Sequence, residues 1–429
     1  MVGVKIRLQA VSPLLLGTKR SYGGQFIESG DYVQGGTLRG ALSNLLLREC
    51  TQPGHKDSHA QCPDKEICKF YRIVGEDANP GVCFSNCYPT QGSFIPWVLP
   101  ATARTCKRYR GFIGDFDPRR DKPEDRPHGV FDVLIHQLVY DRMKDVLPLV
   151  YQAKCPRCGD RTESMSAKYY IGDRILKDYR STEVTRRRRM HVAINRLRHT
   201  SEEGLLYSVS AVEEGTIFIG ATFVEEENLE LLKWSLDQLS DLGRVGGARS
   251  RGLGEVKVEI EPLESDSLPS VRERLEHFNE EVRKVWRIYR ELAIEPVPEE
   301  PQDKFFTVDL QSDAILHTPW GEATLALSEG IISKELRRHG VEGVPNIRLE
   351  RVLTSPVYVS GWQDAWNLPK EVSLAAAKGS VYLYAVKGIS DQLVEALTLL
   401  EQYGIGEQQA EGFGRVVICV PFHLELNPV

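Results

Sequence analysis

The chain has 429 residues, 41% of them hydrophobic and 27% charged, which is typical of an ordinary soluble globular protein with two or three domains. No apolar run approaches the roughly 20 residues that a membrane helix needs, and the first residues do not form a signal peptide. We therefore expect a cytoplasmic protein without membrane contact. Its nine cysteines should be thiols or metal ligands rather than disulfides.

The net charge of −6 does not by itself indicate nucleic-acid binding, but the charges are unevenly placed. Basic residues gather in 104–122 and in 174–198, which includes the run Arg186 to Arg189. Acidic residues gather in three other segments, 225–230, 259–281 and 295–303. A basic face beside acidic helices favours phosphate binding; the alternative is arginines on solvated loops.

The first elements in chain order are a strand and a helix. A period-two pattern over 4–16 predicts the strand, and a Gly/Ser-rich loop follows it. Gly35-Gly36-Thr37 then opens a helix with one apolar face, and Thr37 is its predicted N-cap. Residues 50–190 interrupt the pattern with many Cys, His, Pro and Arg residues and one predicted helix near 129–145, so we interpret them as a large insertion.

Regular structure resumes after the insertion. Strands over 205–212 and 216–224, joined by a tight turn, predict a hairpin, and a helix over 228–241 follows. The heptad spacing over 270–293 predicts a long helix that docks within the chain, with partner binding as the alternative. The Pro/Glu-rich stretch 295–303 is a predicted linker.

A second unit then repeats the order of the first. Its predicted elements are strand 305–316, helix 328–339, strands 350–361 and 380–387, helix 390–402 and a final strand. The glycine-rich loop of each unit, Gly243–Gly254 or Gly404–Gly414, runs straight into the last strand. Such glycines permit positive φ and let another backbone approach closely, which a phosphate chain can exploit.

This βαββαβ order is that of a ferredoxin-like fold, which RNA-recognition domains share. The sequence therefore predicts an α+β protein of two tandem ferredoxin-like (RRM-like) units with a large Cys-bearing insertion in the first. We divide it into residues 1–263, which include the insertion 50–190 and a zinc site, a connecting helix and linker over 264–303, and a second unit over 304–429.

Cys155-Pro-Arg-Cys158 has the spacing of a zinc knuckle, which supplies half of a tetrahedral site. Cys106 and His128 are the nearest candidates to complete a closed, structural Cys₃His site. The alternative is a redox-inert cysteine pair in a tight turn. A weaker second metal candidate is the irregular cluster Cys50, His55, His59, Cys62 and Cys68. We expect Cys83, Cys87 and Cys419 to be buried apolar residues.

Catalytic motifs are scarce. The glycine-rich loops lack a Gly-Lys-Ser/Thr ending, and the chain has no Ser-His-Asp arrangement or HExxH motif. His191 and His199 are candidates for acid–base cleavage of RNA, although they suit RNA contacts equally well. Three acids, Asp115, Asp117 and Asp121, have the chemistry to bind Mg²⁺, but ion pairs on a solvated loop are the favoured interpretation.

With these features the chain resembles the RAMP superfamily of CRISPR-associated proteins over nearly its whole length. Ser250-Arg251-Gly252-Leu253-Gly254 is the most specific segment. The other segments that carry the resemblance are Gly35–Gly40, Val192–Arg196 with Leu206-Tyr207, Gly361–Lys370 with Lys378–Tyr382, and the looser Gly404–Gly414. Within the superfamily the chain is most similar to the large double-RRM RAMP subunit of type III-D effector complexes.

This resemblance implies a non-catalytic subunit for antiviral defence, which holds the 5′ repeat-derived handle of the crRNA. It also implies contacts with the large polymerase-type subunit and the backbone RAMP subunits, and only an indirect relation to target RNA. One alternative is a metal-independent crRNA-processing endoribonuclease of the same superfamily. Another is a scaffold that contacts only proteins.

We expect cations to meet RNA phosphates and tyrosines to stack on bases, with zinc in a structural role. The predicted RNA-binding residues are Lys19, Arg20, Tyr22, Arg39, Arg104, Lys107, Arg186, Arg187, Arg188, Arg189, His191, Tyr207, Arg249, Ser250 and Arg251.

Overall fold

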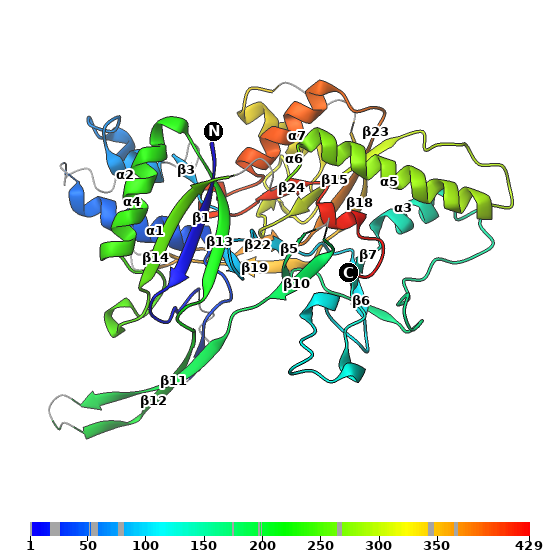
Figure 1. The fold of residues 1–429 in the computed structure, drawn as a ribbon. Coiled ribbons are helices and arrows are strands. Elements are labelled where there is room, and N and C mark those ends of the chain that lie inside the picture. Colours follow the sequence, from blue (N-terminus) through cyan, green and yellow to red (C-terminus); the bar gives the residue numbers. More distant parts are fainter. Residues whose placement is uncertain are drawn as a thin grey trace.

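The protein is a mixed α+β structure that contains several small sheets (Figure 1). This confirms the α+β class predicted from the sequence. No helix in the part of the chain described here is both long and apolar enough to cross a lipid bilayer. The computed structural model describes residues 2–17, 26–50, 52, 59–75, 81–173, 176–195, 198, 200–263, 268–341, 347–363 and 368–429.

The first large sheet has the order β14-β1-β13-β3, with β4 also paired to β13, and all of its pairs are antiparallel. Helices α1 and α4 bury their apolar faces in one core with the sheet. The bounds are β1 Val2–Ala10, α1 Gly35–Leu46, β3 Val82–Cys83, β4 Tyr88–Thr90, β13 Ile217–Val224, α4 Leu229–Leu242 and β14 Val256–Pro262.

Alternation along β1 explains its place in this sheet. Val4, Ile6 and Leu8 are buried, whereas Lys5 and Arg7 lie on the other face and form ion pairs with acids of β14. The helix that follows begins two residues before Thr37, and its N-cap is Gln34, so the predicted N-cap is wrong. Thr37 lies instead in the first turn.

The second large sheet has the order β18-β23-β15-β24, again with antiparallel pairs. Numbered along the chain, both sheets run fourth, first, third, second. All six residues of β23 are buried, as expected of a continuous apolar run. The bounds are β15 Lys304–Leu310, α6 Glu329–Arg338, β18 Arg348–Leu353, β23 Val381–Val386, α7 Asp391–Tyr403 and β24 Val416–Ile418.

The long helix α5, Val271–Leu292, confirms the prediction that the heptad stripe docks within the chain. Its apolar stripe enters the core of the second sheet together with α3, Leu134–Met143. Ser270 caps α5 in a capping box with Glu273, which explains why the helix begins there. Figure 1 shows α5 and α3 side by side at the edge of the molecule.

A small sheet contradicts the predicted hairpin of 205–212 with 216–224. Strand β12, Thr200–Val212, pairs with β11, Arg186–Asn195, and with β2, Phe26–Glu28, whereas β13 belongs to the first large sheet. The turn between β12 and β13 therefore passes the chain from one sheet to another. The hairpin of β11 and β12 projects away from the body of the protein (Figure 1).

A buried charge triad joins the insertion to the second large sheet. His423 lies in the short helical turn Pro421–Leu424, with its Nδ1 3.1 Å from Asp132 Oδ2 and its Nε2 2.9 Å from Asp309 Oδ1. Asp132 ends β7, Val130–Asp132, of the insertion, and Asp309 lies in β15. All three side chains are almost completely shielded from solvent. One imidazolium thus connects two carboxylates from distant parts of the chain.

The two glycine-rich loops share one hydrogen-bond scaffold. In the first loop, Val245 N–H donates to Gly254 O at 2.8 Å and Gly254 N–H to Pro13 O at 3.1 Å. In the second, the corresponding bonds are Ile405 to Gly414 at 2.8 Å and Gly414 to Asp313 at 2.8 Å. Positive φ angles also recur at matching positions, namely Gly246 with Gly406, Ala248 with Gln408, Gly252 with Gly412 and Gly254 with Gly414.

Only the second of these loops docks on the other unit. A Cβ atom on Gly35 would lie 2.8 Å from Glu411 O, and one on Gly412 would lie 2.8 Å from Phe84 O. Glu411 also pairs with Arg39 of α1 at 3.5 Å. The second loop therefore admits a protein backbone where the sequence predicted a phosphate chain, because α1 occupies that space.

The triad generates a prediction about stability and pH. Burial alone would lower the pKa of His423, but Asp309 and Asp132 raise it to about 10. This value lies above the roughly 6.5 of an unfolded histidine, so the folded chain binds the proton more tightly. The stabilisation is complete below about pH 6.5 and is lost as the pH rises toward about 10.

We expect His423→Gln to lower the free energy of unfolding by about 3–5 kcal/mol at pH 6.5, because two buried carboxylates lose their cation. Denaturant unfolding between pH 6.5 and 10 would measure this loss and its decline with pH. His277→Gln on the exposed side of α5 is the matched control and should change neither quantity. An equal loss in both variants would contradict the triad's role.

The loops generate a second prediction from a matched pair of glycines. Gly252→Ala and Gly412→Ala place alanine at φ angles of 81° and 91°, so both incur the same backbone strain. Nothing lies within 4 Å of a Cβ on Gly252, whereas one on Gly412 meets Phe84 O and Asn86. Gly412→Ala should destabilise the protein by about 1–3 kcal/mol more than Gly252→Ala. Equal melting temperatures would show that the joint is loose.

Candidate nucleic-acid interface and metal centre

The four arginines of β11 are divided between the two faces of the hairpin. Residues directly opposite each other in an antiparallel pair share a face, and the register places Arg187, Arg189 and His191 opposite Ala211, Val209 and Tyr207. We call this the cationic face. All four arginines from Arg186 to Arg189 are exposed. Of the four, only Arg187 and Arg189 lie on the cationic face, which adjoins the first glycine-rich loop.

Contacts between the cationic face and the first loop fix the geometry of this site. The rings of His191 and Tyr207 stack with centroids 5.2 Å apart and an interplanar angle of 14°. Arg251 Nη1 donates a hydrogen bond to Tyr207 Oη at 2.7 Å, and its guanidinium lies over the same ring. Val209 packs with Leu253 of the loop. The hairpin and the loop therefore form one continuous basic and aromatic surface.

The first loop itself is open to solvent. Arg249, Ser250 and Arg251 form a short 3₁₀ turn and are all exposed, as predicted for phosphate contacts. Its matching turn in the second loop, Gln409–Glu411, contains the buried Ala410 and docks on α1. The two glycine-rich loops thus share a backbone conformation but present different surfaces.

The opposite face of the hairpin is apolar and was not identified from the sequence. Met190 and Ile194 are 64% and 65% exposed, and Val192 and Leu206 lie beside them. The guanidinium of Arg188 lies over the exposed Phe26 at the base of this face. The sequence does carry a signal for this face, because Met190, Val192 and Ile194 occupy alternate positions directly after the run of arginines.

The remaining predicted RNA contacts lie elsewhere. Arg39 is partly buried in α1, where it bonds Val74 O at 3.1 Å and pairs with Glu411, so it serves the joint between the units. Arg104 and Lys107 lie in and just after β6, Ala103–Cys106, in a different sheet from the hairpin. The predicted contacts Lys19, Arg20 and Tyr22 lie outside the described residues, as does His199.

Two of the candidate acids, Asp115 and Asp117, make contacts within the insertion. Asp115 accepts hydrogen bonds from Ser181 N–H at 2.7 Å and Phe112 N–H at 3.0 Å, and Asp117 pairs with Arg120 at 3.5 Å. The ion-pair interpretation of this loop is confirmed for Asp117. No carboxylate among the described residues bonds His191, whose ring stacks on that of Tyr207.

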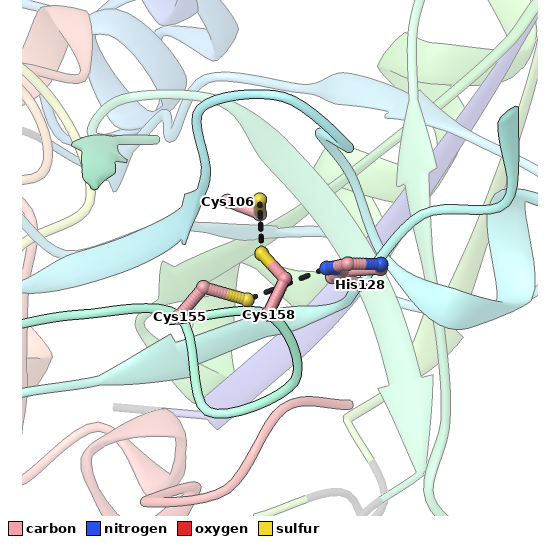
Figure 2. Close-up of side chains that lie close together, drawn as sticks. All are labelled: Cys106, His128, Cys155 and Cys158. Carbon is pink, nitrogen blue, oxygen red and sulfur yellow. Dashed lines mark hydrogen bonds between the residues drawn. The ribbon is translucent and has the colours of Figure 1, made fainter. Parts of the chain in front are cut away.

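The four predicted zinc ligands come together in the insertion. One ligand atom from each of Cys106, His128, Cys155 and Cys158 lies within 4.8 Å of the others. Figure 2 shows the side chains converging from β6, from the segment before β7 and from the Cys155–Cys158 knuckle. Among the described residues this is the only such cluster of three or more ligands.

The spacing within the cluster fits a tetrahedral ion. The sulfur atoms of Cys106 and Cys158 are 3.6 Å apart, and Cys155 Sγ lies 3.4 Å from His128 Nδ1. Zinc bond lengths of about 2.3 Å to sulfur and about 2.0 Å to nitrogen give tetrahedral edges of about 3.8 and 3.6 Å. The set could hold a metal with little rearrangement.

The thiols of the knuckle also favour a cation. Burial opposes ionisation of Cys155, but backbone N–H groups of Cys158 and Arg157 lower its pKa. Backbone hydrogen bonding from Asp160 favours the Cys158 thiolate, yet partial desolvation and the neighbouring sulfur atoms of Cys155 and Cys106 raise its pKa to about 11. The two thiols thus compete for one negative charge, and a bound cation would remove this competition.

The other cysteines divide as follows. In the second cluster, His59 Nδ1 lies 3.9 Å from Cys68 Sγ, and His55 lies outside the described residues. Cys83, Cys87 and Cys419 are buried, which confirms the apolar role predicted for them. Burial raises the pKa of the Cys87 thiol to about 12, so it is inert as a nucleophile.

Comparison with solved structures finds subunits of CRISPR complexes. The type III-B Cmr-β complex bound to cognate target RNA and AMPPNP contains a chain 10% identical to this one, with 92% of this chain and 88% of that chain covered and a TM-score of 0.41. For a type IV-B CRISPR complex the values are 9%, 61%, 90% and 0.30. No curated protein matches the chain.

Comparison with protein families gives two matches, which overlap over residues 178–257 and together span residues 7–421. The RAMP superfamily matches residues 7–257, and the CRISPR-associated protein family Cas_Cmr3 matches residues 178–421. Each match covers more than half of the chain, and each includes the hairpin and the first glycine-rich loop. The protein therefore belongs to the RAMP superfamily and to the Cas_Cmr3 family of CRISPR-associated proteins.

Proposed function

We propose that the protein is a non-catalytic crRNA-binding subunit of a type III CRISPR effector complex and that it holds the 5′ repeat-derived handle. Membership of the Cas_Cmr3 family supports this role. The observation that carries the proposal is the continuous surface formed by the cationic face of the hairpin and the open first loop. The predicted type III-D subdivision stays a prediction.

The geometry suits a short single strand. Arg187 and Arg189 project from β11 to meet successive phosphates, and Arg249 and Arg251 add cations from the loop. The stacked pair of His191 and Tyr207 provides an aromatic platform for a base. The bond from Arg251 to Tyr207 orients both groups before RNA arrives, which lowers the entropy cost of binding.

We also propose that the two large sheets are tandem ferredoxin-like units that arose by duplication. Their identical strand orders and matching loop hydrogen bonds support this interpretation. The boundaries 1–263, 264–303 and 304–429 stay predictions. After duplication, one loop would keep its open surface for RNA while the other became the joint.

Assembly with other subunits is part of the proposal. The apolar face of the projecting hairpin exposes several large side chains, and an exposed patch of this kind is typical of surfaces that partners cover. The proposed neighbours are the large polymerase-type subunit and the backbone RAMP subunits. Target RNA would be met only through the crRNA.

The Cys₃His cluster is proposed as a structural zinc site. Four protein ligands close the coordination sphere, so no open position is left for a reacting water. The ion would hold the knuckle against β6 and thereby fix the outer part of the insertion. Its chemical contribution is charge neutralisation of the thiolates.

A third prediction concerns binding of the crRNA handle by the purified protein. We expect Arg187→Ala/Arg189→Ala to weaken binding of a repeat-derived RNA by roughly 10- to 100-fold and to reduce the salt slope by about 1.4, because two phosphate contacts are lost. Fluorescence anisotropy at several salt concentrations measures both. Arg287→Ala/Arg337→Ala removes two exposed arginines from other helices and should have no effect. Identical curves for the two variants would refute the site.

A fourth prediction separates RNA binding from RNA processing. Purified protein should retain repeat RNA intact in EDTA, because His191 has no described carboxylate partner that would activate it. Gel analysis of end-labelled repeat RNA is the measurement. Metal-independent cleavage that His191→Ala abolishes would establish the endoribonuclease instead.

A fifth prediction concerns the proposed zinc site. Elemental analysis should give one zinc ion per chain, and Cys158→Ser should reduce this value toward zero because one of four ligands is lost. Cys68→Ser in the second cluster should retain one zinc and serves as the control. The freed thiols of Cys158→Ser should also react faster with a thiol reagent. Zinc retention by Cys158→Ser, or its loss from Cys68→Ser, would contradict this assignment.

A further inference from the structure

The metal-ligand cluster gathers a second basic surface away from the hairpin. Lys107 directly follows the ligand Cys106, and Arg157 lies between the ligands Cys155 and Cys158. The backbone N–H of Lys107 donates to the carbonyl of Arg161 at 3.0 Å, which ties the two segments together. Figure 1 shows β6 well separated from the β11–β12 hairpin.

Four cations on these segments have no acidic partner among the residues that the structure describes. Lys107, Arg108, Arg157 and Arg161 are all exposed, and none forms an ion pair within the described chain. Their neighbour Arg110 differs, because it pairs with Glu163. Asp160 is the one acid within the knuckle segment 155–161. Even after the negative charge of a zinc ion with three thiolates is included, the surface stays positive.

An aromatic and cationic stack gives this surface a shape that plain solvated arginines lack. The ring of the candidate ligand His128 stacks on that of Tyr109 with centroids 4.4 Å apart, and the backbone N–H of His128 donates to the backbone carbonyl of Tyr109 at 3.0 Å. The Arg108 guanidinium lies 5.2 Å from the other ring, that of Tyr109. The Tyr109 ring thus contacts both a candidate metal ligand and an exposed guanidinium. Such a plane stacks readily on a nucleobase.

We propose that the metal-held segments form a second contact site for single-stranded RNA. Lys107, Arg157 and Arg161 would meet phosphates, and the guanidinium plane of Arg108 would stack on a base. This site lies beyond the proposed handle site and uses none of its residues. It assigns the metal centre a positioning role, since the ion holds both basic segments in one orientation.

The test uses the full-length protein and a fluorescent 20-nucleotide oligouridine, which lacks any handle sequence. Lys107→Ala/Arg108→Ala/Arg157→Ala/Arg161→Ala should lower its affinity at least tenfold and reduce the salt slope by about 2.1, because three phosphate contacts are lost. A control variant removes four arginines from helices α5 and α6, namely Arg283, Arg287, Arg290 and Arg337. Zinc content and melting temperature confirm that each variant is folded.

A conservative variant separates stacking from charge. Arg108→Lys keeps the cation but loses the guanidinium plane, so affinity should fall several-fold while the salt slope stays constant. An unchanged affinity in the quadruple variant, or an equal loss in the control, would overturn the proposal. Arg187→Ala/Arg189→Ala should leave residual oligouridine binding, so failure of the handle site and failure of this site give different results.

Discussion

The structure depends on one buried cation. His423 lies between Asp132 and Asp309, and this contact connects the insertion, the second large sheet and the last turn of the chain. A charge removed from water is tolerated only when its partners are close and hydrogen-bonded, so the triad favours the arrangement that brings these three segments together. The insertion interrupts the first unit in sequence, yet its helix α3 packs in the core of the second.

A second joint lies where Tyr32, just before α1, meets Tyr88 and Tyr169, both within residues 50–190. The ammonium group of Lys378, from the second unit, lies 4.6 Å from the Tyr32 ring centroid and 5.5 Å from that of Tyr169. Tyr88 and Tyr169 stack at 4.6 Å. Three parts of the chain therefore share one cation–π contact. This joint and the docked second loop leave the first loop and the hairpin as the open surfaces.

Local patterns predicted much of this architecture. The heptad stripe identified α5 and its docking, and the Cys155–Cys158 spacing led to the correct ligand cluster, because both signals depend on short-range geometry. Pairing between distant segments was harder to predict. The strand over 205–212 was assigned to the wrong neighbour, since a tight turn is compatible with either a hairpin or a change of sheet. Burial of the second loop could not be predicted either, because its sequence gives no sign that α1 lies against it.

The hairpin carries a constraint on how its length can vary. Its cationic and apolar faces alternate residue by residue along β11, and the pairing of β12 with β2 anchors the register at the base. Deletion of a single residue near that base would exchange the faces, turning the basic side chains away from the loop and the methyl-rich ones toward it. In related proteins we therefore expect the length of this hairpin to differ in steps of two residues per strand.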